Sequence, residues 1–191
     1  VPTLATVFGL IVAVLADRVW WGNFAKSMVF MPMAISFVGA SVIWKFVYDY
    51  RGPGQEQIGI LNAIATGMGY DPQAWITLPF WNNFFLMAIL IWIQTGFAMV
   101  ILSAALRGVP NETIEAARID GAGRTRMIFS ITLPLIRDNV QTAYIYLGIL
   151  ALDAFVYMAA LNATGGPGNS TLVMSQYLFR TAFEKGQFGL A

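Results

Sequence analysis

The sequence predicts an all-α integral membrane protein, and three observations lead to this fold class. Hydrophobic residues occupy 58% of the 191 positions. Charged residues occupy 11%, less than half of the ~25% that is usual in soluble domains. The apolar residues are also clustered, because positions 72–106 contain no Asp, Glu, Lys or Arg. That run is longer than the ~20 residues that an α-helix needs to cross a bilayer.

Composition also narrows the range of functions. The chain contains no His and no Cys, which excludes Ser–His triads, thiol nucleophiles, haem ligation by His and most zinc sites. The formal net charge is +1, which gives no reason to expect a nucleic-acid partner. We therefore expect no metal and no cofactor, and a transport function rather than an enzymatic one.

Four apolar stretches are candidates for membrane spans. The second stretch, at about 27–48, contains Pro32, which a span tolerates when neighbouring helices satisfy the freed backbone groups. The first is short, and the chain begins inside it without Met, so we expect a fragment of a longer protein. We interpret residues 1–191 as a single transmembrane domain with spans at about 1–16, 27–48, 84–106 and 140–161, and loops at 49–83, 107–138 and 162–191.

The placement of Lys and Arg predicts which loops face the cytoplasm, because cytoplasmic loops carry an excess of these residues. If the spans alternate in direction, the turn at 17–26 and the 107–138 loop lie on one side of the membrane. That side holds more than half of the eleven basic residues, namely Arg18, Lys26, Arg107, Arg118, Arg124, Arg126 and Arg137. We therefore expect the 107–138 loop to be cytoplasmic.

The 107–138 loop has the pattern of two short helices joined at a glycine. Glu115 belongs to the early part of the first helix, where the helix dipole favours acidic residues. Gly121 offers the left-handed backbone conformation that ends many helices. A second helix is expected over about 124–131, with Pro134 at its limit. A loop that only rests on the membrane surface is the alternative, but passive connectors of this length are uncommon.

The same loop carries a pattern that resembles the EAA loop of binding-protein-dependent ABC transporter permeases. Glu-Ala-Ala is followed after three residues by Gly, after nine more by Ile, and after one more by Leu-Pro. The Asp and Ala that flank the Gly also resemble the usual form of the family. The matching positions are Glu115, Ala116, Ala117, Asp120, Gly121, Ala122, Ile131, Leu133 and Pro134.

Segments outside the loop resemble the carbohydrate-uptake branch of this family. The stretch "WIQTGFAMVILSAALRGVP" is similar to the span before the loop, and "GILN" is another familiar element. The stretch "LDAFVYMAALNATGGPGNST" resembles an Asp-containing span followed by a Thr-Gly-Gly-Pro loop. The resemblance covers essentially the whole chain. It implies a helical bundle of the ABC importer permease type that lacks the first and last of the usual six spans.

The resemblance also implies partners in a bacterial-type cytoplasmic (inner) membrane. Two permease subunits, expected to be different chains, form the path, and an extracytoplasmic solute-binding protein delivers a sugar, either an oligosaccharide or a related polyol. Cytoplasmic ABC ATPase subunits hydrolyse ATP. By this likeness Glu115 contacts a basic residue in a cleft of the ATPase, and Gly121 allows the bend between the two helices. The chain has no G-x-x-x-x-G-K-[ST] motif, so ATP is expected on the partner alone.

Polar residues within the expected spans are candidates for the substrate path. Asp153 is the only charged residue in the fourth span, and an intramembrane acid indicates a functional site. Helical spacing places Thr142, Tyr146 and Tyr157 on the same stripe, where aromatic faces and polar groups could hold a sugar. Gln94, in the third span, either lines the path or binds a neighbouring helix. Simple packing of the tyrosines, with Asp153 paired to a donor on a neighbouring span, is the alternative.

Two other classes of protein stay open at this point. One is an ion- or proton-coupled secondary transporter that uses Asp153 as its coupling acid and needs no ATPase. The other is a membrane scaffold whose loop binds a cytoplasmic partner without transport. The fixed spacing of the EAA pattern favours the permease over both. The identity of the sugar and of the second permease subunit stays open as well.

Overall fold

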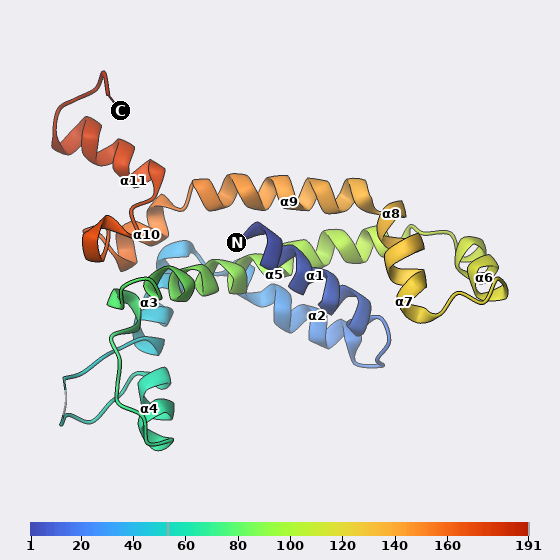
Figure 1. Ribbon diagram of the computed structural model, residues 1–191, viewed down its shortest axis with the longest axis horizontal. Helices are drawn as coiled ribbons and strands as arrows, with labels where there is room; N and C mark the ends of the chain where they lie inside the picture. The colour runs from blue at the N-terminus through green and yellow to red at the C-terminus, as the bar shows by residue number, and fades with distance from the viewer. Residues whose placement is uncertain (53, 191) are drawn as a thin grey trace. The chain divides into compact units, whose positions relative to one another are not determined.

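The computed structural model describes residues 1–52 and 54–190, apart from the side chain of Arg124, and these ranges contain helices and no β-strand. The all-α fold class predicted from composition is therefore confirmed. Figure 1 labels the α-helices. In chain order the elements are α1 (Pro2–Ala16), α2 (Gly22–Phe30), η1 (Met31–Ala34), α3 (Phe37–Val47), α4 (Ile60–Gly67), η2 (Trp75–Thr77), α5 (Asn82–Arg107), α6 (Asn111–Ile119), α7 (Arg124–Arg126), η3 (Met127–Thr132), α8 (Leu133–Leu135), α9 (Arg137–Leu152), α10 (Phe155–Leu161), η4 (Pro167–Asn169), α11 (Met174–Phe179) and η5 (Arg180–Glu184).

Among the described residues, α5 is the one unbroken helix that is long and apolar enough to cross a membrane. Two more crossings are available by length and composition if α2 and η1 join α3, and if α9 joins α10, as bent spans. The helix α1 is apolar but has 15 residues. The span predicted at 84–106 thus agrees with α5, and the stretch predicted at 1–16 agrees with α1.

A break divides each of the spans predicted at 27–48 and 140–161, so neither consists of a single continuous helix. Ile35 and Ser36 interrupt the first, and Asp153 and Ala154 interrupt the second. The first break has a local cause, because the Ser36 hydroxyl accepts the backbone N–H of Gly39 at 3.1 Å and so caps α3. Such a cap starts a new helix instead of continuing the old one.

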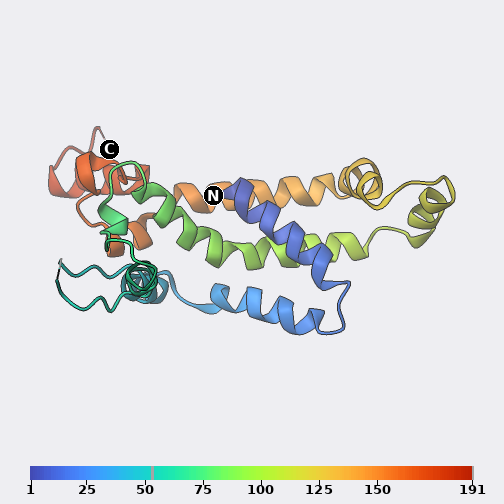
Figure 2. The ribbon, with the colours of Figure 1, turned by 60° about the horizontal axis from the view of Figure 1, so that its bottom comes forward.

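The chain divides into two compact units, which are described separately. Unit 1 consists of Val1–Ala34 and Ile91–Ile149. In it, α9 runs beside the second half of α5, as Figures 1 and 2 both show. One buried cluster joins these helices to α1 through Ala5, Ala98 and Leu147. A second buried cluster consists of Ala13, Met99, Leu102 and Ile136.

Small residues set the distance between helices in unit 1. A Cβ at Gly9 of α1 would lie 2.6 Å from the Cβ of Ala98 and 2.7 Å from the backbone nitrogen of Met99. A Cβ at Gly96 would lie 2.7 Å from the carbonyl oxygen of Val29. All three distances are shorter than van der Waals contact, so these helices approach each other only because glycine lacks a side chain.

Unit 2 consists of Ile35–Leu90 and the residues from Leu150 onward. Its helices α3 and α10 pack against each other. Tyr48 donates its hydroxyl to the Phe85 carbonyl at 2.9 Å, and Tyr157 donates to the adjacent Leu86 carbonyl at 2.7 Å. These bonds tie α3 and α10 to the first turns of α5, and they satisfy two buried hydroxyls within an apolar core.

Candidate functional site

The first helix of the 107–138 loop, α6, ends in a Schellman motif at Gly121. The backbone N–H of Gly121 donates to the Arg118 carbonyl at 3.0 Å, and that of Ala122 donates to the Ala117 carbonyl at 2.9 Å. This pair of bonds requires a left-handed residue between them, and Gly121 has a φ of +79°. The prediction that Gly121 ends the first helix is confirmed, and the pattern residue stands where the backbone needs glycine.

The EAA residues divide between the two faces of α6. Ala117 is buried, whereas Glu115, Ala116 and Asp120 are exposed. Ile119 lies beside them with 87% of its side-chain surface exposed. The exposed face of α6 therefore combines an acid, a small residue and a large apolar residue that the described chain leaves uncovered. Ile119 is not one of the EAA pattern residues. The sequence indicated it only as an apolar side chain on the polar face of a short helix.

The second helix of the loop is longer than predicted. It continues as α7, η3 and α8 from Arg124 to Leu135, and Pro134 lies inside its last segment rather than beyond its end. The intermediate segment η3 has π-helical hydrogen bonding. Pro134 has no N–H to donate to the carbonyl four residues earlier, and a π-helical segment is one way in which a helix rearranges its bonding around such a gap.

Ile131 and Leu133 are partly buried, and Pro134 is exposed. Leu133 packs against the buried cluster that contains Leu102 and Ile136. The part of the pattern after Gly121 therefore connects the loop to the core of unit 1, while the part before it presents an exposed surface.

A large cavity lies between the two loop helices and the bundle of unit 1. Its volume is about 1020 Å³, and its lining includes Asp17, Ile114, Arg118, Met127 and Thr132. The two loop helices thus contact the rest of unit 1 on one side and face open space on another. Helices in a close-packed interior resist displacement. Because α6 lies over an open cavity instead, it has room to move relative to α1 and α5.

Two of the candidate path residues lie in unit 1. Gln94 is buried, and its Oε1 has no hydrogen-bond partner among the described residues. Tyr146 is exposed, and its ring stacks on Phe97 with a centroid distance of 4.1 Å and an interplanar angle of 30°. The stack between Tyr146 and Phe97 was not predicted, because it joins residues on two different helices.

The other two candidates lie in unit 2. Asp153 is exposed at the break between α9 and α10. Tyr157 is 2% exposed, and its hydroxyl is occupied by the Leu86 carbonyl. The predicted stripe of Thr142, Tyr146, Asp153 and Tyr157 along one helix is therefore wrong, because the helix does not continue past Leu152. Tyr157 has the packing role that the sequence left open.

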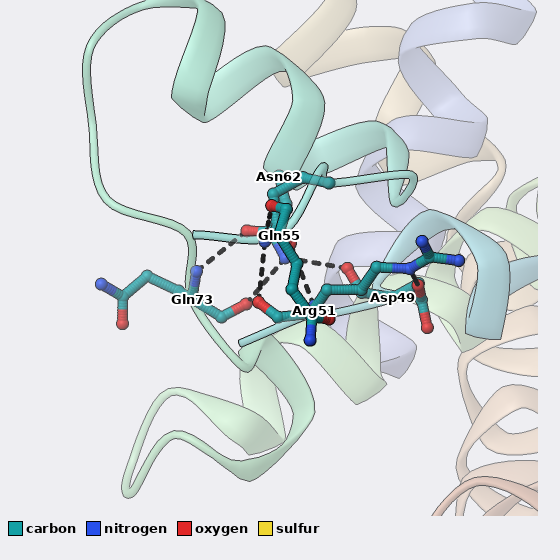
Figure 3. A network of polar contacts seen from close by, with 6 residues as sticks. Asp49, Arg51, Gln55, Asn62 and Gln73 are labelled. Carbon is teal, nitrogen blue, oxygen red and sulfur yellow. Dashed lines mark hydrogen bonds and ion pairs between the residues drawn. The ribbon is translucent and has the colours of Figure 1, made fainter. Parts of the chain in front are cut away.

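The "GILN" element organises a loop of unit 2, shown in Figure 3. The side chain of Asn62 is fully buried, and its amide nitrogen donates to the carbonyls of Asp49 at 2.8 Å and Gln73 at 3.0 Å. Its amide oxygen accepts the Gln73 backbone N–H at 2.9 Å. Gly59 is needed because a Cβ there would lie 2.2 Å from the Asp49 carbonyl oxygen. One asparagine thus holds together both ends of the 49–73 loop.

Comparison with known proteins places this geometry in context. A family model described as "Binding-protein-dependent transport system inner membrane component" matches residues 5–188. The alpha-glucoside transport system permease protein AglF of Rhizobium meliloti (strain 1021) is 59% identical over 99% of this chain. The osmoprotective compounds uptake permease protein GgtC of Synechocystis sp. is 48% identical over 99% of it, and the diacetylchitobiose uptake system permease protein NgcF of Streptomyces coelicolor is 47% identical over 88%.

This chain spans about half to two thirds of these relatives, covering 56% of AglF, 67% of GgtC and 47% of NgcF. Among solved structures, the fold is similar to a chain of a bacterial ABC transporter involved in the import of the acidic polysaccharide alginate. The TM-score is 0.81 at 22% identity, with 97% of this chain and 66% of that chain covered. A second structure, the alginate transporter in complex with an alginate pentasaccharide-bound periplasmic protein, gives a TM-score of 0.82.

Proposed function

Because the chain belongs to the family of inner-membrane components of binding-protein-dependent transport systems, we propose that it is the permease subunit of an ATP-driven sugar importer. Residues 1–191 form a single transmembrane domain of that subunit. A second, different permease subunit completes the path, and an extracytoplasmic binding protein delivers the solute. The relatives named above as sugar permeases support this assignment.

The observation that carries the proposal is the exposed face of α6 with its Schellman turn. Glu115, Ala116 and Asp120 are presented outward, and Gly121 sets the direction of the chain after them. An acid, a small residue and an uncovered Ile119 suit insertion into a groove of a soluble protein, where the isoleucine is buried and the acid meets a cation. The groove belongs to a cytoplasmic ABC ATPase, so the 107–138 loop is cytoplasmic.

Coupling then works through the two attachments of this loop. At one end the loop continues from α5, and at the other Leu133 packs on the buried cluster of unit 1. The cavity beneath α6 gives the loop room to move when the ATPase subunits close. Because packed cores switch between discrete arrangements rather than deform continuously, this movement is passed to α5 and α9. The chain itself binds no ATP and needs no cofactor.

The cargo is a neutral oligosaccharide or a related polyol, and α-glucosides are the first to test because of the 59% identity to AglF. The stacked rings of Tyr146 and Phe97 present an apolar face of the kind that a sugar ring packs on. Gln94 contributes a buried amide oxygen, Oε1, without a hydrogen-bond partner in the described chain. In unit 2, Asp153 is a separate candidate, and its acid repels anionic cargo. Tyr157 ties α10 to α5 through its bond to the Leu86 carbonyl.

The test is reconstitution of the complete complex, with its ATPase subunits and its binding protein, into proteoliposomes loaded with ATP. We expect uptake of a labelled α-glucoside that needs both internal ATP and the binding protein, and ATP hydrolysis that the loaded binding protein stimulates. Uptake that persists without ATP and collapses when the ion gradient is removed would instead identify a secondary transporter that uses Asp153.

A further inference from the structure

A groove between α2 and α5 in unit 1 has no part in the sites described above. Its volume is about 330 Å³, and its lining changes in character along its length. Lys26 and Arg107 lie at one end, and Phe30, Met99 and Val100 lie toward the other. Because Lys26 precedes Phe30 by one helical turn, the charged and apolar ends are about 6 Å apart along α2. The groove is therefore amphipathic.

The polar end carries an excess of positive charge. The Nζ of Lys26 lies 2.6 Å from Oδ1 of Asp17, and Nη2 of Arg107 lies 3.6 Å from the same oxygen. One carboxylate thus serves two cations. None of the described residues that line the groove is acidic. Lys26 and Arg107 together keep about one positive charge that Asp17 does not neutralise, and an anion is the complementary ligand.

A buried hydroxyl points to the same ligand. Ser103 lines the groove, is 6% exposed, and has no hydrogen-bond partner for its Oγ among the described residues. A buried hydroxyl without a partner is rare and costs free energy. The other hydroxyl in the groove belongs to Ser27, which already donates to the Asn23 carbonyl at 3.0 Å. Ser103 therefore offers an unused hydrogen-bond donor in a groove that Lys26 and Arg107 also line.

The position of the groove favours a lipid over a soluble anion. Trp20, in the turn that connects α1 to α2, is 97% exposed, and exposed tryptophans of membrane proteins lie at the level of the lipid headgroups. Lipid phosphates lie at the same level. Phe30 and Val100 are exposed at the apolar end, where an acyl chain can lie along them. A soluble phosphate would leave that end uncovered.

We propose that this groove binds an anionic phospholipid, with the phosphate on Lys26, Arg107 and Ser103 and an acyl chain along Phe30 and Val100. Basic pockets between membrane helices recognise anionic headgroups in this way. Binding there bridges α2 and the end of α5 from which the 107–138 loop begins. The proposal requires that the chain lies in a membrane, but it does not depend on which solute is transported.

The experiment uses the complete purified complex, stripped of lipid in detergent, and measures binding by native mass spectrometry and by the shift in thermal unfolding. The probes are short-chain phosphatidylglycerol, short-chain phosphatidylcholine and glycerol phosphate. We expect phosphatidylglycerol to bind and raise the unfolding temperature, and the other two to do neither. Lys26→Gln and Ser103→Ala should each weaken phosphatidylglycerol binding on the order of tenfold, because each removes a bond to a charged group.

Three control variants distinguish loss of the lipid-binding groups from loss of the fold. Lys26→Arg should retain binding, which separates loss of the charge from loss of the fold. Ser27→Ala removes a hydroxyl of the same groove that is already occupied, and Arg18→Gln removes a cation of the same turn that does not line the groove. Both should bind like the unchanged chain. Equal binding of the two lipids, occupancy by glycerol phosphate, or unaltered affinity in Lys26→Gln and Ser103→Ala would each overturn the proposal.

Discussion

The backbone N–H of Ala122 donates to the carbonyl of Ala117 at 2.9 Å, and Gly121 lies between them with a φ of +79°. A Cβ at Gly121 would meet no atom within 4 Å. The need for glycine is therefore conformational and not a matter of space. The surface that we assign to ATPase docking ends at this turn, so changes at Gly121 redirect the surface without disturbing the core of unit 1.

We expect Gly121→Val to uncouple transport. A β-branched residue in the left-handed region costs about 1–2 kcal/mol, so the turn shifts while the subunit still inserts and assembles. Sugar uptake and substrate-stimulated ATP hydrolysis in proteoliposomes should both fall. Gly123→Val is the matched control, because Gly123 is equally open but has no positive φ. Gly121→Asn should recover part of the activity, since Asn tolerates this conformation. Equal activity of the Gly121 and Gly123 variants would remove the role of the turn.

Removal of the Glu115 carboxylate should weaken attachment of the ATPase subunits. A charge-assisted contact at an interface is worth about 1.5–3 kcal/mol, so Glu115→Ala should lower the affinity at least tenfold, measured by titrating the ATPase onto the permease in detergent. Glu112→Ala changes the same helix outside the pattern and should have a small effect. A Glu115 variant that binds the ATPase as tightly as the Glu112 variant would contradict the docking role.

Close packing of α1 on α5 predicts opposite results for two glycine-to-alanine changes. Gly9→Ala places a methyl group 2.6 Å from the Cβ of Ala98, which forces the helices apart and costs about 1–3 kcal/mol. Gly148→Ala in α9 meets no atom within 4 Å and should be neutral or stabilising, because alanine favours helix by about 1 kcal/mol. Thermal unfolding in detergent compares the two. An equal fall in stability for both would show that the open space at Gly148 is occupied in the assembled protein.

Loss of the Asn62 side chain should loosen the 49–73 loop. Asn62→Ala removes three hydrogen bonds, each with a net worth of about 1 kcal/mol. Hydrogen exchange of the amides near Arg51 should become faster. Gln73→Ala is the control, because Gln73 contacts Asn62 through its backbone atoms only. If both variants exchange alike, the loop is held by contacts other than the Asn62 amide.

The parts of the fold that the sequence predicted are those with a local cause. Gly121 ends α6 because of its own backbone conformation, and the uncharged run that covers all of α5 except Arg107 is visible in the sequence. The break at Asp153 and Ala154 had no such signal, because neither residue is a strong helix breaker. The burial of Tyr157 and the stack of Tyr146 on Phe97 depend on partners far away in the sequence, which residue spacing along one helix does not reveal.

The most direct test of ATPase docking at the exposed face of α6 is a cross-link from Ala116 to the ATPase subunit. Residues 1–191 contain no Cys, so Ala116→Cys supplies a thiol that is unique within them, on the exposed face of α6. We expect a short bifunctional reagent to join it to the ATPase subunit in the intact complex and to stop uptake, whereas Ser130→Cys, exposed on the second helix, should cross-link less. A thiol at Ala116 that forms no cross-link and stays as reactive in the complex as in the isolated subunit would contradict the account.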